Sequence, residues 1–271
     1  MIHVGPAGYP RGSKGPVDAV ERAHALGFTA LEVQFVRQAR MAEAKARAAG
    51  QRAKELGVLL SAHAPYYVNL NSPSPSTREK SVEWILRSAR LCHQLQAWVL
   101  VVHAASYSGS SARVCTEAVL EGLGACLERM EGEGIEDVRL GLETMGKRGS
   151  WGTIGEIEAA VRRMPRVVPV LDFAHLHARS QGGLRTSRDF QRALSEVRAF
   201  YRGHLHCHFS CIEYTGQGER RHLPLSARSP DYSILARLLR RRRGAMTLIS
   251  ETPPPEEGAS SMMSMLSSPG A

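Results

Sequence analysis

Short apolar runs alternate with longer amphipathic stretches along the whole chain. The apolar runs have the length of strands and predict them at 2–5, 30–35, 58–63, 98–103, 138–143, 167–172, 204–209 and 246–251. Apolar residues with a helical period predict helices between these runs, at 17–26, 38–56, 77–95, 112–132, 153–163, 187–199 and 230–242. Strict alternation of strands and helices predicts a parallel sheet, and eight strands predict a closed (β/α)₈ TIM barrel of the α/β class, formed by a single domain.

An open, doubly wound sheet is the main alternative to the barrel. Such a sheet normally carries a glycine-rich phosphate loop after its first strand, but residues 5–12 read GPAGYPRG and do not match G-x-G-x-x-G. The barrel is therefore favoured and is assigned to residues 1–254. Residues 210–229 are expected to form a long loop, and residues 255–271 a C-terminal tail with room for a short closing helix before a disordered end.

Composition narrows the class of protein less than the strand pattern does. The 271 residues are 43% apolar and carry a formal net charge of +9, which suits a polyanionic partner but equally suits a chain whose arginines only keep it in solution. The five cysteines form no C-x-x-C pair, which argues against a disulfide framework. Neither a signal peptide nor an apolar run of membrane-spanning length is evident, so a cytoplasmic protein without a membrane partner is expected.

Residues that can bind metal ions lie at the ends of the predicted strands. They are His63, His103, Glu143, Asp172 and Glu251, with His206 inside the seventh strand and His175 just after the sixth. A single histidine at a strand end is more often structural than a ligand. Six successive strands that each deliver such a residue are a stronger signal, because all strands of a parallel barrel end at the same mouth.

The chemistry of these side chains predicts a metal centre with more than one ion. Imidazole and carboxylate ligands without a thiolate suit zinc, manganese or iron, whereas calcium and magnesium prefer nearly all-oxygen sites. So many carboxylates and imidazoles in one place would repel one another or acquire large pKa shifts without cations. Two or three ions, two of them bridged by a carboxylate, would resolve this conflict.

Seven sequence blocks in the same order resemble endonuclease IV, the zinc-dependent apurinic/apyrimidinic endonuclease family. They are SAHAPYYVNL (61–70), VVHAAS (101–106), LGLETMG (140–146), VLDFAHLHAR (170–179), HLHCHFS (204–210), GERRHLPL (218–225) and LISET (248–252). The resemblance runs from about residue 2 to residue 252, and it implies the same barrel and a centre of about three zinc ions.

The resemblance also implies a ligand set. The first zinc is expected on His63, His103 and Glu143, and the second on Glu143, Asp172, His206 and Glu251. The family motif selects His206 by its spacing to Ser210, and His208 is left as a supporting or phosphate-contacting residue. The third zinc is expected on His175, His222 and an acidic residue. The family has Asp-x-His at this place, but Arg220 stands where the aspartate belongs, so Glu219 is expected to bind instead.

The function implied by the resemblance is DNA repair. The expected reaction is zinc-dependent hydrolysis of the phosphodiester 5′ to an abasic site in double-stranded DNA by a monomer, leaving a 3′-hydroxyl and a 5′-deoxyribose phosphate, with Glu143 as the bridging catalytic carboxylate. Tyr66 and Arg37 are expected to contact the DNA beside the lesion. One alternative is a metal-dependent sugar isomerase or epimerase on the same barrel, in which His63, His175 and His222 would not be needed as metal ligands. The other is a protein that binds the DNA lesion without catalysis.

Overall fold

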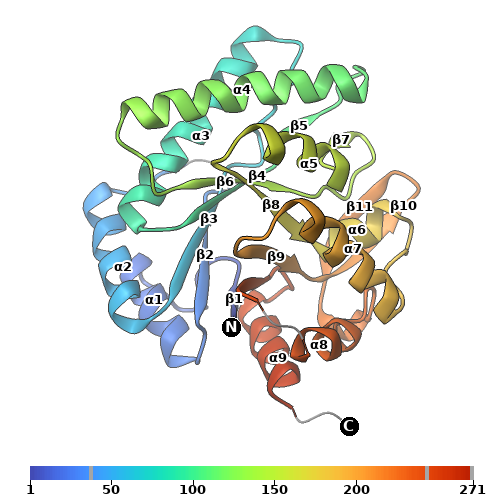
Figure 1. Cartoon of the computed structure of the whole chain (residues 1–271). Helices are drawn as coiled ribbons and strands as arrows, with labels where there is room; N and C mark the ends of the chain where they lie inside the picture. Colours follow the sequence, from blue (N-terminus) through green and yellow to red (C-terminus); the bar gives the residue numbers. More distant parts are fainter. Residues whose placement is uncertain (37–38, 242–243, 269–271) are drawn as a thin grey trace.

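The computed structural model describes residues 1–36, 39–241 and 244–268, and within them eight parallel strands form a nearly closed barrel with helices around its outside (Figure 1). The barrel strands are β1 (Ile2–Pro6), β2 (Ala30–Gln34), β3 (Leu59–His63), β4 (Val99–Val102), β6 (Arg139–Glu143), β8 (Val167–Asp172), β9 (Leu205–Phe209) and β12 (Met246–Ser250). All eight lie within about two residues of the predicted runs, so the predicted TIM barrel is confirmed.

The helices follow the strands as the alternation predicts. They are α1 (Pro16–Ala25), α2 (Glu43–Leu56), α3 (Pro75–Leu95), α4 (Ala112–Gly132), α5 (Ile154–Arg163), α6 (Phe173–Arg179), α7 (Ser187–Phe200), α8 (Tyr232–Arg240) and α9 (Pro255–Ser267). Helix α6 was not predicted. It begins directly after β8 because the Asp172 carboxylate accepts the backbone N–H of His175 and so caps the helix.

The barrel closes where β1 meets β12 on one side and β2 on the other. Strand β1 pairs in parallel register with β12 from Ile2 opposite Met246 onward. On its other side, a parallel bridge joins Ala7 to Glu32, and β1 approaches β2 so closely that a Cβ on Gly5 would lie 1.8 Å from the carbonyl oxygen of Ala30. A glycine is therefore required at this point of the seam.

The two faces of each strand have different roles. Alternate residues such as Leu60, Leu171 and Cys207 point outward and join the apolar core beneath the helices. The intervening positions point into the barrel, and several of them are polar yet fully buried, among them Ser61 and His208. The interior of the barrel thus carries the chemistry, and the layer between strands and helices carries most of the packing.

Two segments outside the barrel strands differ from the predictions. Residues 210–229, expected as a loop, contain an antiparallel hairpin of β10 (Cys211–Thr215) and β11 (Gly218–Leu223), followed by the 3₁₀ helix η1 (Leu225–Ala227). A second small antiparallel pair joins β5 (Ala105–Ser106) to β7 (Ser150–Trp151). Both pairs contribute residues to the cavity at the mouth where the candidate metal-binding residues gather.

The C-terminal tail contains a helix, for which the sequence left room. Helix α9 packs against β1 and α8 and buries Ala259 and Met262, so it covers this end of the barrel. Residues 269–271 lie outside the described residues. Within the described part of the chain, no helix combines the length and the apolar character needed to cross a bilayer.

Candidate metal centre

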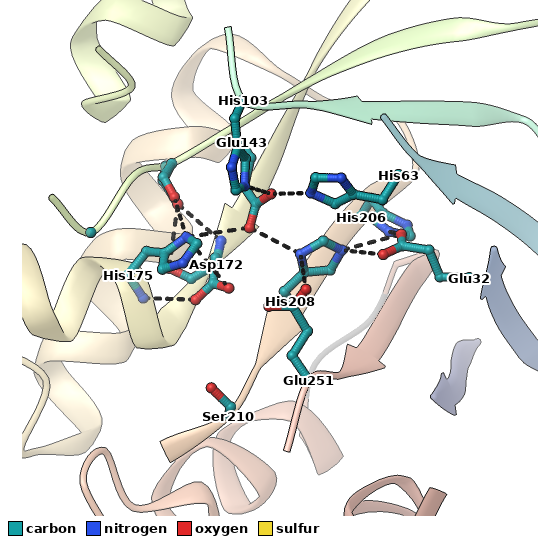
Figure 2. A network of polar contacts seen from close by, with 12 residues as sticks. Glu32, His63, His103, Glu143, Asp172, His175, His206, His208, Ser210 and Glu251 are labelled. Atoms are coloured by element: carbon teal, nitrogen blue, oxygen red, sulfur yellow. Dashed lines mark hydrogen bonds and ion pairs between the residues drawn. The ribbon is translucent and has the colours of Figure 1, made fainter. Parts of the chain in front are cut away.

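Ionisable side chains from several barrel strands meet at one mouth of the barrel (Figure 2). Glu143 lies at the middle of this group, where β6 ends, and both of its carboxylate oxygens are used. Its Oε2 lies 3.2 Å from Nε2 of His63 and 2.8 Å from Nε2 of His103. Its Oε1 lies 3.0 Å from Nδ1 of His208 and 3.3 Å from Nδ1 of His175. One carboxylate is therefore shared by two sets of histidines.

The first set consists of His63, His103 and Glu143, whose candidate ligand atoms lie within 4.8 Å of one another. His63 closes β3, and His103 directly follows β4. Strands β3 and β4 are neighbours, and β4 pairs with β6, so three adjacent strands supply the set. These are the residues that the sequence assigned to the first ion.

The second set consists of Glu143, Asp172, His208 and Glu251, again within 4.8 Å of one another. His208 Nδ1 lies 3.7 Å from Oε1 of Glu251. The Oδ2 atom of Asp172 is buried and has no hydrogen-bond partner among the described residues. A buried carboxylate oxygen without a donor is costly unless a cation completes its environment, which supports a metal ion at this place.

The sequence assigned His206 to this second set, but the structure places His208 in the set and His206 outside it. Both imidazoles point into the barrel, but Asp172 of β8 lies opposite His208 whereas His206 lies opposite Val170, one layer deeper. Nε2 of His206 instead lies 2.8 Å from Oε2 of Glu32. Figure 2 shows this pair on the side of the network away from Asp172. His206 is therefore absent from the group around Glu143 and Glu251.

Hydrogen bonds orient the imidazoles as metal ligands require. Nδ1 of His63 lies 2.7 Å from the carbonyl oxygen of Ala64, and Nδ1 of His175 lies 2.9 Å from that of Thr144. A carbonyl only accepts, so each Nδ1 carries the proton and each Nε2 is left to bind an ion. Fixing one ring nitrogen in this way is the usual arrangement behind histidine ligands. The residues present thus fit a metal centre.

Charge and burial act in opposite directions on the carboxylates. Burial disfavours ionisation of Glu143, but the positive charges of His208 and His103 outweigh it and hold the pKa of this carboxyl well below its usual range. Burial raises the pKa of Asp172 to about 8 against the opposing charge of His175. A cation placed between Asp172 and Glu143 would stabilise the ionised form of both groups.

A third set lies on the hairpin side of the mouth. Oε2 of Glu219 lies 3.0 Å from Nε2 of His175 and accepts the backbone N–H of Gly146 at 3.1 Å. Nδ1 of His222 lies 2.7 Å from the Ser210 hydroxyl. Glu219 and His222, which the sequence assigned with His175 to a third ion, both line the cavity at the mouth. The three residues do not form a compact three-ligand group among the described residues.

A β-bulge explains how Glu219 and His222 reach the same cavity although they are three positions apart. Glu213 pairs with Arg221, and Tyr214 pairs with Glu219, so Arg220 is an extra residue in β11. The extra residue restores the inward direction for His222. Arg220 itself points outward and forms an ion pair with Glu213, so it does not enter the site where the endonuclease IV pattern has an aspartate.

The cavity at the mouth has a volume of about 590 Å³. Its lining combines Tyr66, Asn69 and Lys147 with five of the candidate ligands, namely His103, His175, Glu219, His222 and Glu251. The ring of Tyr66 lies 5.0 Å from that of His63, and the residue is 47% exposed, so one edge of the phenol faces solvent at the entrance. Arg37, the other residue expected to contact DNA, lies outside the described residues.

Sequence reasoning missed Glu32, which is fully buried in β2 and contacts both His206 and His208. A signal for it existed. Glu32 is a charged residue within the apolar run ALEVQF, and a buried charge in a strand requires partners of opposite charge or hydrogen-bond donors.

Comparisons with known proteins place this site in a wider context. An uncharacterized protein of Methanocaldococcus jannaschii is 30% identical over 246 residues, which cover 89% of this chain and 88% of that protein. A "Probable endonuclease 4" of Symbiobacterium thermophilum is 28% identical over 198 residues, 69% of each chain. The protein of the same name from Malacoplasma penetrans is 28% identical over 120 residues, which cover only 42% of this chain and 40% of its own length.

Solved structures share the fold at low sequence identity. Endonuclease IV from Thermus thermophilus superposes with a TM-score of 0.74 at 20% identity and covers 97% of both chains. A D-tagatose 3-epimerase-like protein superposes with a TM-score of 0.69 at 16% identity and covers 94% of both chains. The family description "xylose isomerase-like TIM barrel" matches residues 20–268. The chain therefore belongs to the xylose isomerase-like TIM barrel family.

Proposed function

We propose that this protein is a zinc-dependent endonuclease that hydrolyses the phosphodiester 5′ to abasic sites in double-stranded DNA. The observation that carries the proposal is the sharing of Glu143 between two sets of metal-binding residues. A carboxylate with one oxygen in each set is the usual bridge between two ions that act together on a phosphodiester. The partial sequence similarity to proteins named "Probable endonuclease 4" supports the same class of reaction.

The roles of the residues follow from their positions. His63 and His103 would hold one ion with Glu143, and Asp172, His208 and Glu251 would hold the other. Bound zinc ions would polarise the phosphate and lower the pKa of a bound water molecule. The protein side chains alone would not supply these two effects. His175, Glu219 and His222 would hold a third ion, with Glu219 in place of the aspartate of the endonuclease IV pattern.

Tyr66 and Lys147 would position the DNA. Burial raises the pKa of the Tyr66 phenol, and the charges of Glu251 and Glu143 raise it further, so the hydroxyl remains a hydrogen-bond donor at neutral pH. The ring would fill the space left in the helix beside an abasic nucleotide, which is easily extruded because no base has to be unstacked. Lys147 has a 62% exposed side chain at the cavity and would pair with a backbone phosphate.

The proposal includes double-stranded DNA as the partner and a monomer acting in the cytoplasm. The formal net charge of +9 supports a polyanionic partner, because release of counterions from DNA favours association. Affinity for DNA should accordingly fall steeply as the salt concentration rises.

A sugar epimerase is the second candidate. The set of Glu143, Asp172, His208 and Glu251 is sufficient for a single ion, and the cavity of about 590 Å³ would accommodate a monosaccharide. The fold similarity to the D-tagatose 3-epimerase-like protein agrees with this alternative. It gives no role to His63 and His103 as ligands of a separate ion, and for that reason we favour the nuclease.

A nicking assay combined with metal analysis tests the proposal. Zinc-loaded protein should cut a 5′-labelled duplex at a single tetrahydrofuran abasic analogue and leave an undamaged duplex intact. Glu143→Gln should reduce the rate by at least about 10³-fold, because the loss of bridged ions removes several kcal/mol of transition-state stabilisation. Glu158→Gln, a change at a partly exposed carboxylate on α5, should cut like the wild type.

The competing functions give different results in the same experiments. Epimerisation of ketoses by protein that holds one ion per chain would overturn the nuclease proposal in favour of the sugar enzyme. Tight binding of the abasic duplex without any nicking at full zinc occupancy would indicate a lesion-binding protein.

A further inference from the structure

Beneath the candidate metal centre, the carboxylate of Glu32 contacts four side chains among the described residues. The Ser61 hydroxyl donates to Oε2 at 3.0 Å, and the Gln34 amide donates to Oε1 at 2.9 Å. Nε2 of His206 lies 2.8 Å from Oε2, and Nε2 of His208 lies 3.1 Å from Oε1. Glu32 is fully buried and lies outside all the roles assigned above.

His208 is held between two carboxylates, one on each ring nitrogen. Its Nδ1 lies 3.0 Å from Oε1 of Glu143 in the metal centre, and its Nε2 faces Glu32 on the opposite side. Figure 2 shows the imidazole between these two groups. A carboxylate only accepts hydrogen bonds when ionised, so Nε2 must keep its proton to satisfy Glu32. When an ion binds between Glu143, Asp172 and Glu251, Nδ1 is therefore the nitrogen that would give up its proton and face the ion.

We propose that Glu32 is a positioning residue that fixes the orientation and the tautomer of His208, so that His208 binds the second ion through Nδ1. Carboxylates behind metal-binding histidines commonly act in this way, and their removal weakens metal binding by about 10- to 100-fold. The inference rests on the metal centre of the proposed function, but it does not depend on DNA being the substrate.

Glu32, His206 and His208 also lie close enough together to be considered as an ion site of their own. Two observations favour the positioning role instead. Both oxygens of Glu32 already accept hydrogen bonds from Ser61 and Gln34, so they are already engaged. In addition, one imidazole cannot present Nδ1 to the second ion and Nε2 to another ion without losing both protons.

Zinc titration of the stripped protein tests the role of Glu32. The wild type and Glu32→Gln should be loaded with zinc chloride against a competing chelator, and the ions per chain should be measured. In Glu32→Gln, one ion should bind about 10- to 100-fold more weakly, while the ion on His63 and His103 keeps its affinity. Gln34→Ala is the matched control, because it removes one donor to Glu32 and leaves His208 untouched; zinc affinity should change less than about 2-fold.

Nitrogen NMR of zinc-loaded wild-type protein provides a second readout that does not require the variant to fold. His208 should carry its proton on Nε2. A proton on Nδ1, or unchanged affinity for every ion in folded Glu32→Gln, would overturn the proposal. An additional ion lost in both Glu32→Gln and His206→Gln would overturn it as well, by making Glu32 a ligand. Weakened zinc binding in Glu32→Gln together with wild-type protein that fails to nick DNA would support the role of Glu32 and refute only the nuclease.

Discussion

Replacing Asp172 by asparagine should make the metal-stripped protein more stable at alkaline pH than the wild type. Asp172 is completely buried, and its Oδ2 has no hydrogen-bond partner among the described residues. Burial raises the pKa of the carboxyl from its ordinary value of 3.8 to about 8, against the opposing charge of His175. The negative charges of Glu251 and Glu143 reinforce the rise. The folded, stripped protein therefore favours the neutral form, which asparagine imitates.

The direction and size of the effect follow from linkage between protonation and folding. A carboxyl with a higher pKa in the folded state stabilises the fold while it is protonated; the contribution of Asp172 is complete below pH 3.8 and is lost as the pH rises to about 8. One pKa unit corresponds to about 1.4 kcal/mol. The rise in the pKa of Asp172 from 3.8 to about 8 therefore corresponds to a contribution to the free energy of unfolding on the order of 6 kcal/mol. Roughly 4 kcal/mol of this loss falls between about pH 5 and pH 9.

Thermal unfolding followed by circular dichroism measures this difference. Both proteins are treated with chelator, shown to be free of metal, and unfolded at about pH 5, 7 and 9. As the pH rises from about 5 to about 9, the melting temperature of Asp172→Asn should increase by roughly 8 °C relative to that of the wild type. Glu128→Gln, a change at an exposed carboxylate on α4, should follow the wild type at every pH.

Zinc should reverse the order of stability, because asparagine offers no anionic ligand to the second ion and the wild type gains binding energy that the variant lacks. Parallel pH curves for stripped wild type and Asp172→Asn would refute the reasoning. They would mean that the buried carboxyl costs the folded state nothing when it ionises.

Two further predictions concern the entrance of the site. Gly218→Ala should lower the free energy of unfolding by about 2 kcal/mol and expose the hairpin to proteases. Gly218 has a φ of 103°, and an added Cβ would lie 2.1 Å from the carbonyl oxygen of Gly146. Gly216→Ala, with open space around the added Cβ, should behave like the wild type in thermal unfolding and limited proteolysis. Tyr66→Ala should raise KM for an abasic duplex about 10-fold at unchanged zinc content, because the exposed ring at the cavity is lost; an unchanged KM would exclude Tyr66 from DNA contact.

The barrel was predictable because its strands and helices differ in period and length. Each strand has an outward apolar face toward the helices, so apolar runs mark all eight strands in the described chain. The hairpin of β10 and β11 lacks this signal, since it lies outside the barrel and most of its side chains are only partly buried or exposed. A turn signal was present at Gly216–Gly218, but charged residues around it made the segment resemble a loop.

The gathering of ionisable strand ends at one mouth was predictable from the parallel strands, but the depth of each side chain within the barrel was not. His206 and His208 share one face of β9, so the two-residue period cannot choose between them. The choice depends on register, because Asp172 lies opposite His208 and Val170 lies opposite His206. Register is set by pairing with the neighbouring strand, which a single sequence does not specify. The spacing of the family motif to Ser210 selects His206, which is the deeper histidine.

The hairpin explains why Arg220 does not exclude an acidic residue from the third set. In a regular strand, Glu219 and His222 would point to opposite faces because they are an odd number of positions apart. The bulge at Arg220 adds one residue against Glu213 and Tyr214, which brings both side chains to the cavity. Arg220 is paired with Glu213 on the outer face, so its charge is partly balanced outside the site. Glu219 lies one position before the aspartate of the endonuclease IV pattern. The bulge at Arg220 compensates for this shift, so β11 still directs a carboxylate and an imidazole into the cavity.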